Sequence, residues 1–302
     1  MAGPVCDSRG ADVKASPGRR ANGRAVTGGR VEPKRRGLRH SGSRPPHRGA
    51  EMRTTILALA VMAGLAPWPA VADTEVRDLE DFDRVVFALP GKLRLTQGDD
   101  FAVAIEAEPE DLERIETDRQ GDTLAIRWDS GLLGMWSGSP EGPIEVRITL
   151  PELRGLEVAG SGDVEAGAWL SESLVLEVNG SGSVHLASLA VESLTIDIAG
   201  SGDAEIDELD AAALRVEIAG SGNVELAGAA DRQEIDVMGS GDVDADGLEG
   251  AVVQVDVMGS GDVSVWATEA LSVDIMGSGD VRYRGNPRLE RSAAGSGDVR
   301  PL

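Results

Sequence analysis

The tetrad Gly-Ser-Gly-Asp recurs through the second half of the chain at nearly constant intervals. A fixed period near 20 residues, with a constant turn beside an apolar strand, is typical of a β-solenoid, because each coil buries its apolar face only against its neighbours. The repeat therefore predicts an all-β fold, a right-handed parallel β-helix with coils of about 20 residues. The eight copies, spaced by 18 to 20 residues and with Ser183 and Asn223 in place of Asp in two of them, start at Gly160, Gly180, Gly200, Gly220, Gly239, Gly259, Gly277 and Gly295.

The strands beside the tetrads alternate between apolar and acidic residues. Each of the first seven tetrads follows a triplet with two aliphatic residues around an acid, as in Leu156-Glu157-Val158, and most are followed by Val and a second apolar residue two positions later. Because side chains of a strand alternate between its two sides, the aliphatic residues are expected inside and the acids outside. Alignment of the repeats then predicts two acidic columns, one starting at Glu157 and one at Glu165.

The first 72 residues are expected to lie outside the folded domain. Residues 52–72 combine Arg53, an apolar core and a small-residue site at Ala70-Val71-Ala72, which is the pattern of a secretory signal peptide. An uncut signal anchor is the alternative. Residues 1–51 are rich in Arg, Gly, Ser and Pro, so we expect a disordered basic leader that is not translated if the start is Met52; a basic arm for nucleic acid is the alternative.

Charge narrows the classes of partner. Residues 1–72 hold 13 Lys and Arg against 4 Asp and Glu, and because the whole chain carries −23, residues 73–302 carry −32. Such a charge opposes binding to nucleic acid or anionic lipid. After the signal the sequence contains no Cys and no further apolar stretch long enough to span a membrane, and its composition leaves the oligomeric state open.

The chain that is predicted to remain after signal cleavage has two segments. Residues 73–150 contain short β-favouring runs and are expected to open the solenoid, and residues 151–302 form the repeat itself. Between the runs lies a Gly/Ser/Pro-rich loop, residues 129–142, with four large apolar residues. We expect this loop either to cover the open end of the solenoid or to form an exposed partner-binding tip, and its apolar residues are Leu132, Leu133, Met135 and Trp136.

Several motifs together resemble the head GIN domain family, described as putative auto-transporter adhesins. The resemblance rests on Phe82-Asp83-Arg84-Val85, on Leu93 to Gly98, and on Pro151-Glu152-Leu153 leading into the first tetrad, and it covers roughly Phe82 to Val299. It implies an exported bacterial β-helix with a presumed binding role, located in the periplasm, at the cell surface or outside the cell. It implies no catalytic residue.

Two interpretations of the tetrads remain open. Their glycines suit a repeated corner turn in which Ser and Asp hydrogen-bond nearby amides. Alternatively their carboxylates form a ladder for calcium, a hard cation that prefers oxygen ligands, although the Gly-Gly-x-Gly-x-Asp pattern of calcium solenoids is absent. The candidate metal ligands are Asp163, Asp203, Asp242, Asp262, Asp280 and Asp298.

Catalysis finds little support in the sequence. His185 is the one histidine after residue 72, so a His-assisted nucleophile lacks a partner set, and Cys/His zinc patterns are absent. A β-helix enzyme acting on polysaccharides stays an alternative, but its acids would gather in one irregular coil. The sequence therefore favours an exported, non-catalytic protein, adhesin-like or structural in the cell envelope, with an unknown surface ligand and no cofactor other than calcium as an alternative.

Overall fold

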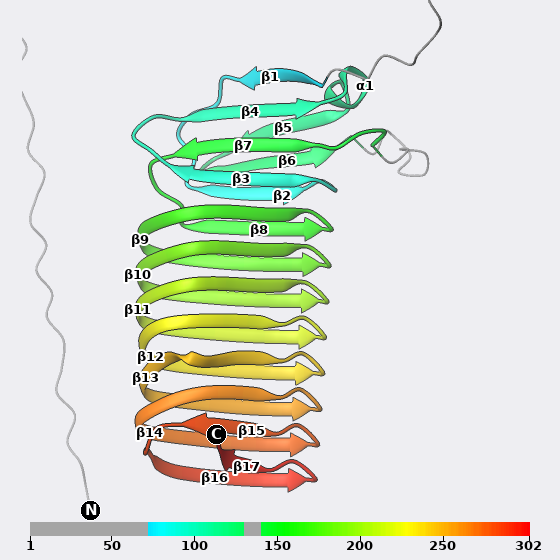
Figure 1. Cartoon of the computed structure of the whole chain (residues 1–302). Coiled ribbons are helices and arrows are strands. Elements are labelled where there is room, and N and C mark those ends of the chain that lie inside the picture. The colour runs from blue at the N-terminus through cyan, green and yellow to red at the C-terminus, as the bar shows by residue number, and fades with distance from the viewer. Residues whose placement is uncertain (1–71, 130–139) are drawn as a thin grey trace, which may run out of the picture. The chain divides into compact units, whose positions relative to one another are not determined.

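The computed structural model describes residues 72–129 and 140–302, and these residues form one stack of β-coils (Figure 1). The predicted parallel β-solenoid with coils of about 20 residues is confirmed by the register, which pairs residue i with residue i+20 in the central coils. The leader and signal-peptide predictions fall on residues outside the described ranges. In the described part of the chain, the structure contains no helix of the length and hydropathy needed to cross a membrane.

The N-terminal segment contains short strands and one helical turn. They are β1 (Asp73–Arg77), β2 (Arg84–Ala88), β3 (Lys92–Gln97), β4 (Ala102–Ala107), α1 (Pro109–Leu112), β5 (Ile115–Gln120), β6 (Thr123–Trp128) and β7 (Glu145–Leu150). The repeat contains β8 (Gly155–Gly160), β9 (Asp163–Gly180), β10 (Ser183–Gly200), β11 (Asp203–Gly220), β12 (Val224–Gly239), β13 (Val243–Gly259), β14 (Val263–Gly277), β15 (Val281–Arg284), β16 (Arg288–Gly295) and β17 (Val299–Pro301).

Each central coil is one long strand that bends once between two tetrads. Its first part lies on one side of the stack and its second part on the other, as the paired runs of each coil in Figure 1 show. We call the sheet that runs into the tetrads face A; it contains β6, β2, β8, the second parts of β9 to β14, and β16. Face B follows the tetrads and contains β7, β3, the first parts of β9 to β14, β15 and β17.

Aliphatic side chains from both faces fill the space between them. Val158 and its equivalents on face A are buried, as are Val164 and its equivalents on face B, so the predicted alternation is confirmed. Burial of one such side chain stabilises the fold by roughly 1.5–3 kcal/mol, and stacking makes the core continuous along the solenoid. In the described coils of the repeat, the polar side chain of Gln233 enters this core: it is 2% exposed and donates from Nε2 to the backbone oxygen of Leu248 at 3.2 Å.

The first coils do not follow chain order. Strand β2 pairs with both β6 and β8, and β3 pairs with both β7 and β9, all in parallel. The coil made by β2 and β3 therefore lies between two coils that come later in the sequence. Above them β4 and β5 run antiparallel to β7 and β6, and β1 runs antiparallel to β4. This antiparallel layer covers the apolar end of the stack.

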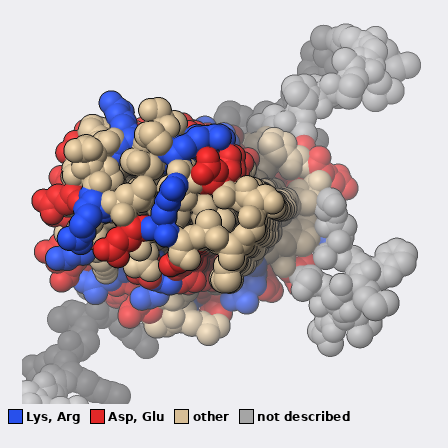
Figure 2. Space-filling view, turned by 90° about the horizontal axis from the view of Figure 1, so that it is seen from below, with Lys and Arg blue, Asp and Glu red and all other residues tan. Residues whose placement is uncertain are grey.

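The C-terminal coil departs from the repeat. In β16 the aliphatic–acid–aliphatic triplet is replaced by Arg291, Ser292 and Ala293, and all three side chains are exposed. Arginines gather in this region, at Arg282, Arg284, Arg288, Arg291 and Arg300. Figure 2 looks onto this end of the stack, where basic side chains (blue) lie among acidic ones (red).

Candidate functional site

The glycines of the tetrads bring consecutive coils into backbone contact. The first glycine of every tetrad has a positive φ, for example +146° at Gly180, a conformation that side chains disfavour. A Cβ at Gly180 would lie 2.2 Å from the backbone oxygen of Gly160, which already accepts a hydrogen bond from the Ser181 N–H at 2.7 Å. The corner-turn interpretation therefore accounts for these glycines: they allow the turns to stack without side chains between them.

The tetrad carboxylates link neighbouring coils. The Oδ1 atom of Asp242 accepts the backbone N–H of Asp262 at 2.8 Å, and Asp262 accepts the N–H of Asp280 at 2.9 Å. Asp203 accepts the N–H of Asn223 at 3.0 Å, and Asp280 that of Asp298 at 3.1 Å. We expected such bonds within each turn, but they run along the stack, because the tetrads lie directly above one another.

The six predicted metal ligands thus occupy one column, and its hydrogen bonds use one carboxylate oxygen of most members. At the C-terminal end the second oxygen faces arginine: Asp262 Oδ2 lies 3.3 Å from Arg282 and Asp280 Oδ2 lies 3.2 Å from Arg300. These contacts give the column a structural role. The calcium ladder stays a prediction.

The predicted partner-binding residues Leu132, Leu133, Met135 and Trp136 lie outside the described residues. The chain that follows them is held by Asp111, which is 2% exposed. Its Oδ2 accepts the N–H of Glu141 at 3.0 Å and that of Gly142 at 3.2 Å. A buried carboxylate with two amide donors thus fixes the point where the chain returns to the sheet.

Face A carries an unbroken row of carboxylates, which we call the face A acid row. The residues are direct register partners in successive coils, so their backbones lie about 4.8 Å apart. Arg215 is the cation that pairs with this row in the part of the chain that the structure describes: it binds Asp236 at 2.8 Å, Glu217 at 2.5 Å and also Glu234 beside the row. The row contains Glu157, Glu177, Asp197, Glu217, Asp236, Asp256 and Asp274.

Crowding of these carboxylates changes their acidity. Partial burial, followed by the charge of Glu217, raises the pKa of Asp197 above its ordinary value. Partial burial also raises the pKa of Asp236, against the opposing effect of Arg215. The raised pKa values mean that the folded chain destabilises the ionised form of each carboxylate, and a bound cation would reduce this destabilisation.

Face B has cations near both ends and acids between them. Lys92 and Arg94 bind Glu165 at 2.5 and 2.8 Å, and the hydrogen bond from Lys92 lowers the pKa of the Glu165 carboxyl. Further along the face a hollow of about 240 Å³ opens on the surface. Its acidic lining consists of Glu205, Asp207, Glu225, Asp244 and Asp246.

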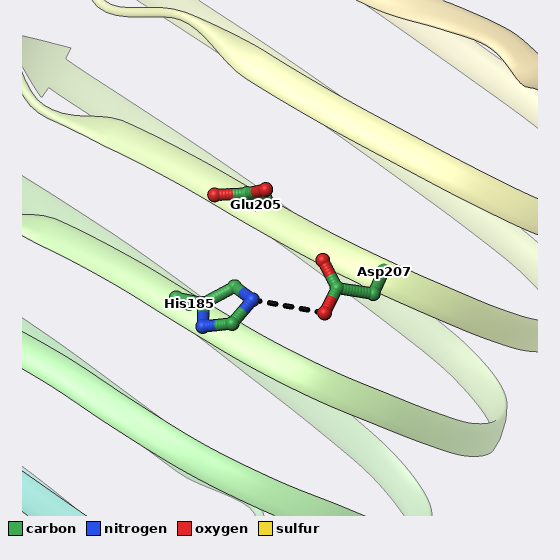
Figure 3. A group of neighbouring side chains, drawn as sticks. All are labelled: His185, Glu205 and Asp207. Carbon is green, nitrogen blue, oxygen red and sulfur yellow. Dashed lines mark hydrogen bonds and ion pairs between the residues drawn. The ribbon is translucent and has the colours of Figure 1, made fainter.

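A histidine lies at the edge of this hollow. His185 of β10 is the register partner of Glu205 in β11, and Asp207 lies two residues further on the same side. His185 Nε2 lies 3.0 Å from Asp207 Oδ2, and one ligand atom from each of the three residues lies within 4.8 Å of the other two (Figure 3). One imidazole nitrogen and two carboxylates form a donor set suited to a divalent transition metal.

Sequence reasoning missed this cluster, because it weighed His185 only as a catalytic residue that lacks partners. The signal is nevertheless present in the repeat. Residues 20 apart are neighbours in the stack, so His185 lies beside Glu205.

Comparison with known protein families shows which family the chain is related to. Residues 81–287 match the model of the family described as putative auto-transporter adhesin, head GIN domain. The chain belongs to this family. The resemblance inferred from the motifs is therefore confirmed. No curated protein matches the chain.

Solved structures share the fold. A structure named as a putative lipid binding protein from Parabacteroides distasonis has 26% identity and a TM-score of 0.74, and the match covers 78% of this chain and 98% of that one. A putative adhesin from Parabacteroides merdae has 21% identity and a TM-score of 0.73, over 78% of this chain and 97% of that one. A second putative adhesin from P. distasonis has 20% identity and a TM-score of 0.69 over the same share of this chain and 98% of its own.

Proposed function

We propose that this head GIN domain protein is an exported, non-catalytic, adhesin-like protein that binds a positively charged, repetitive ligand along face A. Export is supported by the signal-peptide pattern of residues 52–72 and by the family. A binding role is supported by the family and by its solved relatives, two of which are named as putative adhesins. The observation that carries the choice of ligand is the face A acid row.

The row favours an extended ligand over a small molecule. Seven carboxylates at intervals of about 4.8 Å present the same group over a length of roughly 29 Å. Residues 155–281 hold 26 Asp and Glu against two Arg, so the central coils attract cations from a distance. A polymer that carries an amine on each unit could engage several coils at once and gain affinity through multivalency.

Chitosan oligomers, which carry one amine per sugar, provide the test, and their N-acetylated counterparts provide a neutral control. The chain immobilised for biolayer interferometry should bind the amine form, and the affinity should fall steeply as salt is raised from about 50 to about 200 mM. The double variant Asp256→Asn/Asp274→Asn should weaken binding at least tenfold. Glu205→Gln/Glu225→Gln on face B is the matched control and should change it little. Equal binding of both oligomers, or loss in the control variant alone, would refute the proposal, and release of shortened oligomers would refute its non-catalytic part.

A second candidate function is binding of a divalent metal ion, favoured by the geometry of His185, Glu205 and Asp207. The imidazole favours zinc or a similar ion over calcium, which takes oxygen ligands. Zinc at fixed ionic strength should raise the melting temperature of the chain, and His185→Ala should abolish the rise. Calcium tests the tetrad column in the same assay: Asp242→Asn should remove a calcium effect if that column is the site, and leave the zinc effect intact.

A further inference from the structure

Three methionines form a row on the outside of face A. Met238 of β12, Met258 of β13 and Met276 of β14 are direct register partners. Their exposed fractions are 44%, 45% and 59%, so three large apolar side chains lie at the surface in adjacent coils. Packing within the corner, the role that their position before the tetrad glycine suggests, therefore does not explain them.

Methionine occupies this strand position in only three consecutive coils of the repeat. The same column holds Ala199 and Ala219 before the row and Ala294 after it. The whole chain has seven methionines, and three of them stand in consecutive coils at this one position. Folding does not require a thioether at this strand position next to the turn, because alanine occupies it in the neighbouring coils.

The geometry brings the three sulfurs within reach of one small ion. Register partners in parallel strands lie about 4.8 Å apart, so Met258 has a thioether neighbour on each side. Methionine has three rotatable bonds, which let the outer two side chains lean toward the middle one. Nothing else need move, since all three side chains already lie at the surface.

The chemistry of the row selects a soft monovalent cation. Thioethers are soft, neutral ligands that favour copper(I) over zinc or calcium. A positive ion is attracted there by Asp236, Asp256 and Asp274, which lie two residues before each methionine and point to the same side of the strand. We propose that Met238, Met258 and Met276 form a binding site for copper(I) or the chemically similar silver(I). This proposal does not rest on the ligand proposed for the acid row, although the two sites share Asp236, Asp256 and Asp274.

Silver(I) provides a probe that avoids copper redox chemistry. The full chain, labelled with ¹³C at the methionine methyl groups, is titrated with silver nitrate in buffer free of chloride and thiols. The methyl resonances of the three row methionines should shift and saturate at one ion per chain. Met135, which lies outside the row, serves as the internal reference and should stay in place.

Variants test whether the thioethers themselves bind the ion. Met258→Leu keeps the size and apolar character of the side chain but removes the sulfur, and should weaken silver binding at least tenfold while leaving the melting temperature of the metal-free chain unchanged. Met135→Leu is the control and should bind as the parent does. Retained affinity in Met258→Leu, loss of affinity in Met135→Leu, or equal shifts at Met135 and at the row methionines would overturn the proposal.

Discussion

Substituting alanine for one tetrad glycine tests how the coils are held together. At Gly180 the added Cβ meets two obstacles, the positive φ of +146° and the Gly160 oxygen 2.2 Å away. The backbone conformation costs about 1–3 kcal/mol. Displacing Gly160 also disturbs its hydrogen bond with Ser181, worth about 0.5–1.5 kcal/mol, in addition to the steric strain. We expect Gly180→Ala to destabilise the fold by about 3–5 kcal/mol, a fall in melting temperature of about 6–20 °C.

Two further glycines separate the cost of the backbone conformation from the cost of contact with the neighbouring coil. Gly160 occupies the same tetrad position with a φ of +121°, but a Cβ there would meet nothing within 4 Å, because no tetrad glycine lies above it. Gly160→Ala should therefore show only the backbone cost of about 1–3 kcal/mol. Gly167 combines a φ outside the left-handed region with open space, so Gly167→Ala should be neutral or stabilise by up to about 1 kcal/mol.

Thermal unfolding followed by circular dichroism measures all three variants at one protein concentration. From highest to lowest, the expected order of melting temperatures is Gly167→Ala, then Gly160→Ala, then Gly180→Ala, with a clear gap between the last two. If Gly180→Ala and Gly160→Ala melt together, close contact between coils is not what requires the glycine, and the corner account fails.

Three other predictions concern carboxylates. The raised pKa values of Asp197 and Asp236 mean that, as pH falls, the folded chain binds protons before the unfolded chain does. The melting temperature should therefore rise as pH falls toward about 4, the ordinary range of an aspartate, and Asp197→Asn/Asp236→Asn should flatten that rise; a rise of the same size in the double variant would contradict it. Asp242→Ala should cost about 0.5–1.5 kcal/mol in urea unfolding because the Asp262 amide loses its acceptor, whereas Asp298→Ala, whose carboxylate accepts from the next residue and not from another coil, should cost less. Asp111→Ala should cost about 2–3 kcal/mol in the same assay, since two amides lose a buried acceptor, and a cost below about 0.5 kcal/mol would show that the tether is dispensable.

The repeat made the solenoid predictable from sequence. Once the tetrads are aligned, the period-two alternation places Val158 and its equivalents inside and Glu157 and its equivalents outside in the first seven coils of the repeat, and the structure agrees. The acidic columns follow from the same alignment. These features depend on local patterns that recur, so each copy reinforces the assignment of the others.

The order of the first coils could not be predicted in this way. Whether β2 pairs with β6 or with β8 depends on contacts between distant segments, and the short apolar runs of residues 73–150 carry no signal that selects one partner. The structure shows that β2 has both partners. Alternation predicts which side of a strand is buried, but it does not predict the neighbour.

Side-chain details were partly within reach. The pairing of His185 with Glu205 follows from the 20-residue register, and the Asp207 contact follows from period two. The bridge from Arg215 to Asp236 was harder to find, because the coil between Gly220 and Gly239 is one residue shorter and shifts the alignment. The exposure of Met258 was also within reach, because it lies two residues after the outward-facing Asp256 and alternation places both on the outside of face A.

The central claim is that the face A acid row binds a ligand, whereas the tetrads form the corners of the coils. Carboxyl footprinting of the full chain by mass spectrometry, with and without saturating chitosan oligomer, tests it most directly. The account predicts that the ligand protects Asp197, Asp236, Asp256 and Asp274 across several coils and leaves Asp203 and Asp242 of the tetrads labelled as before. Protection confined to the tetrad aspartates, or to a single coil, would contradict it.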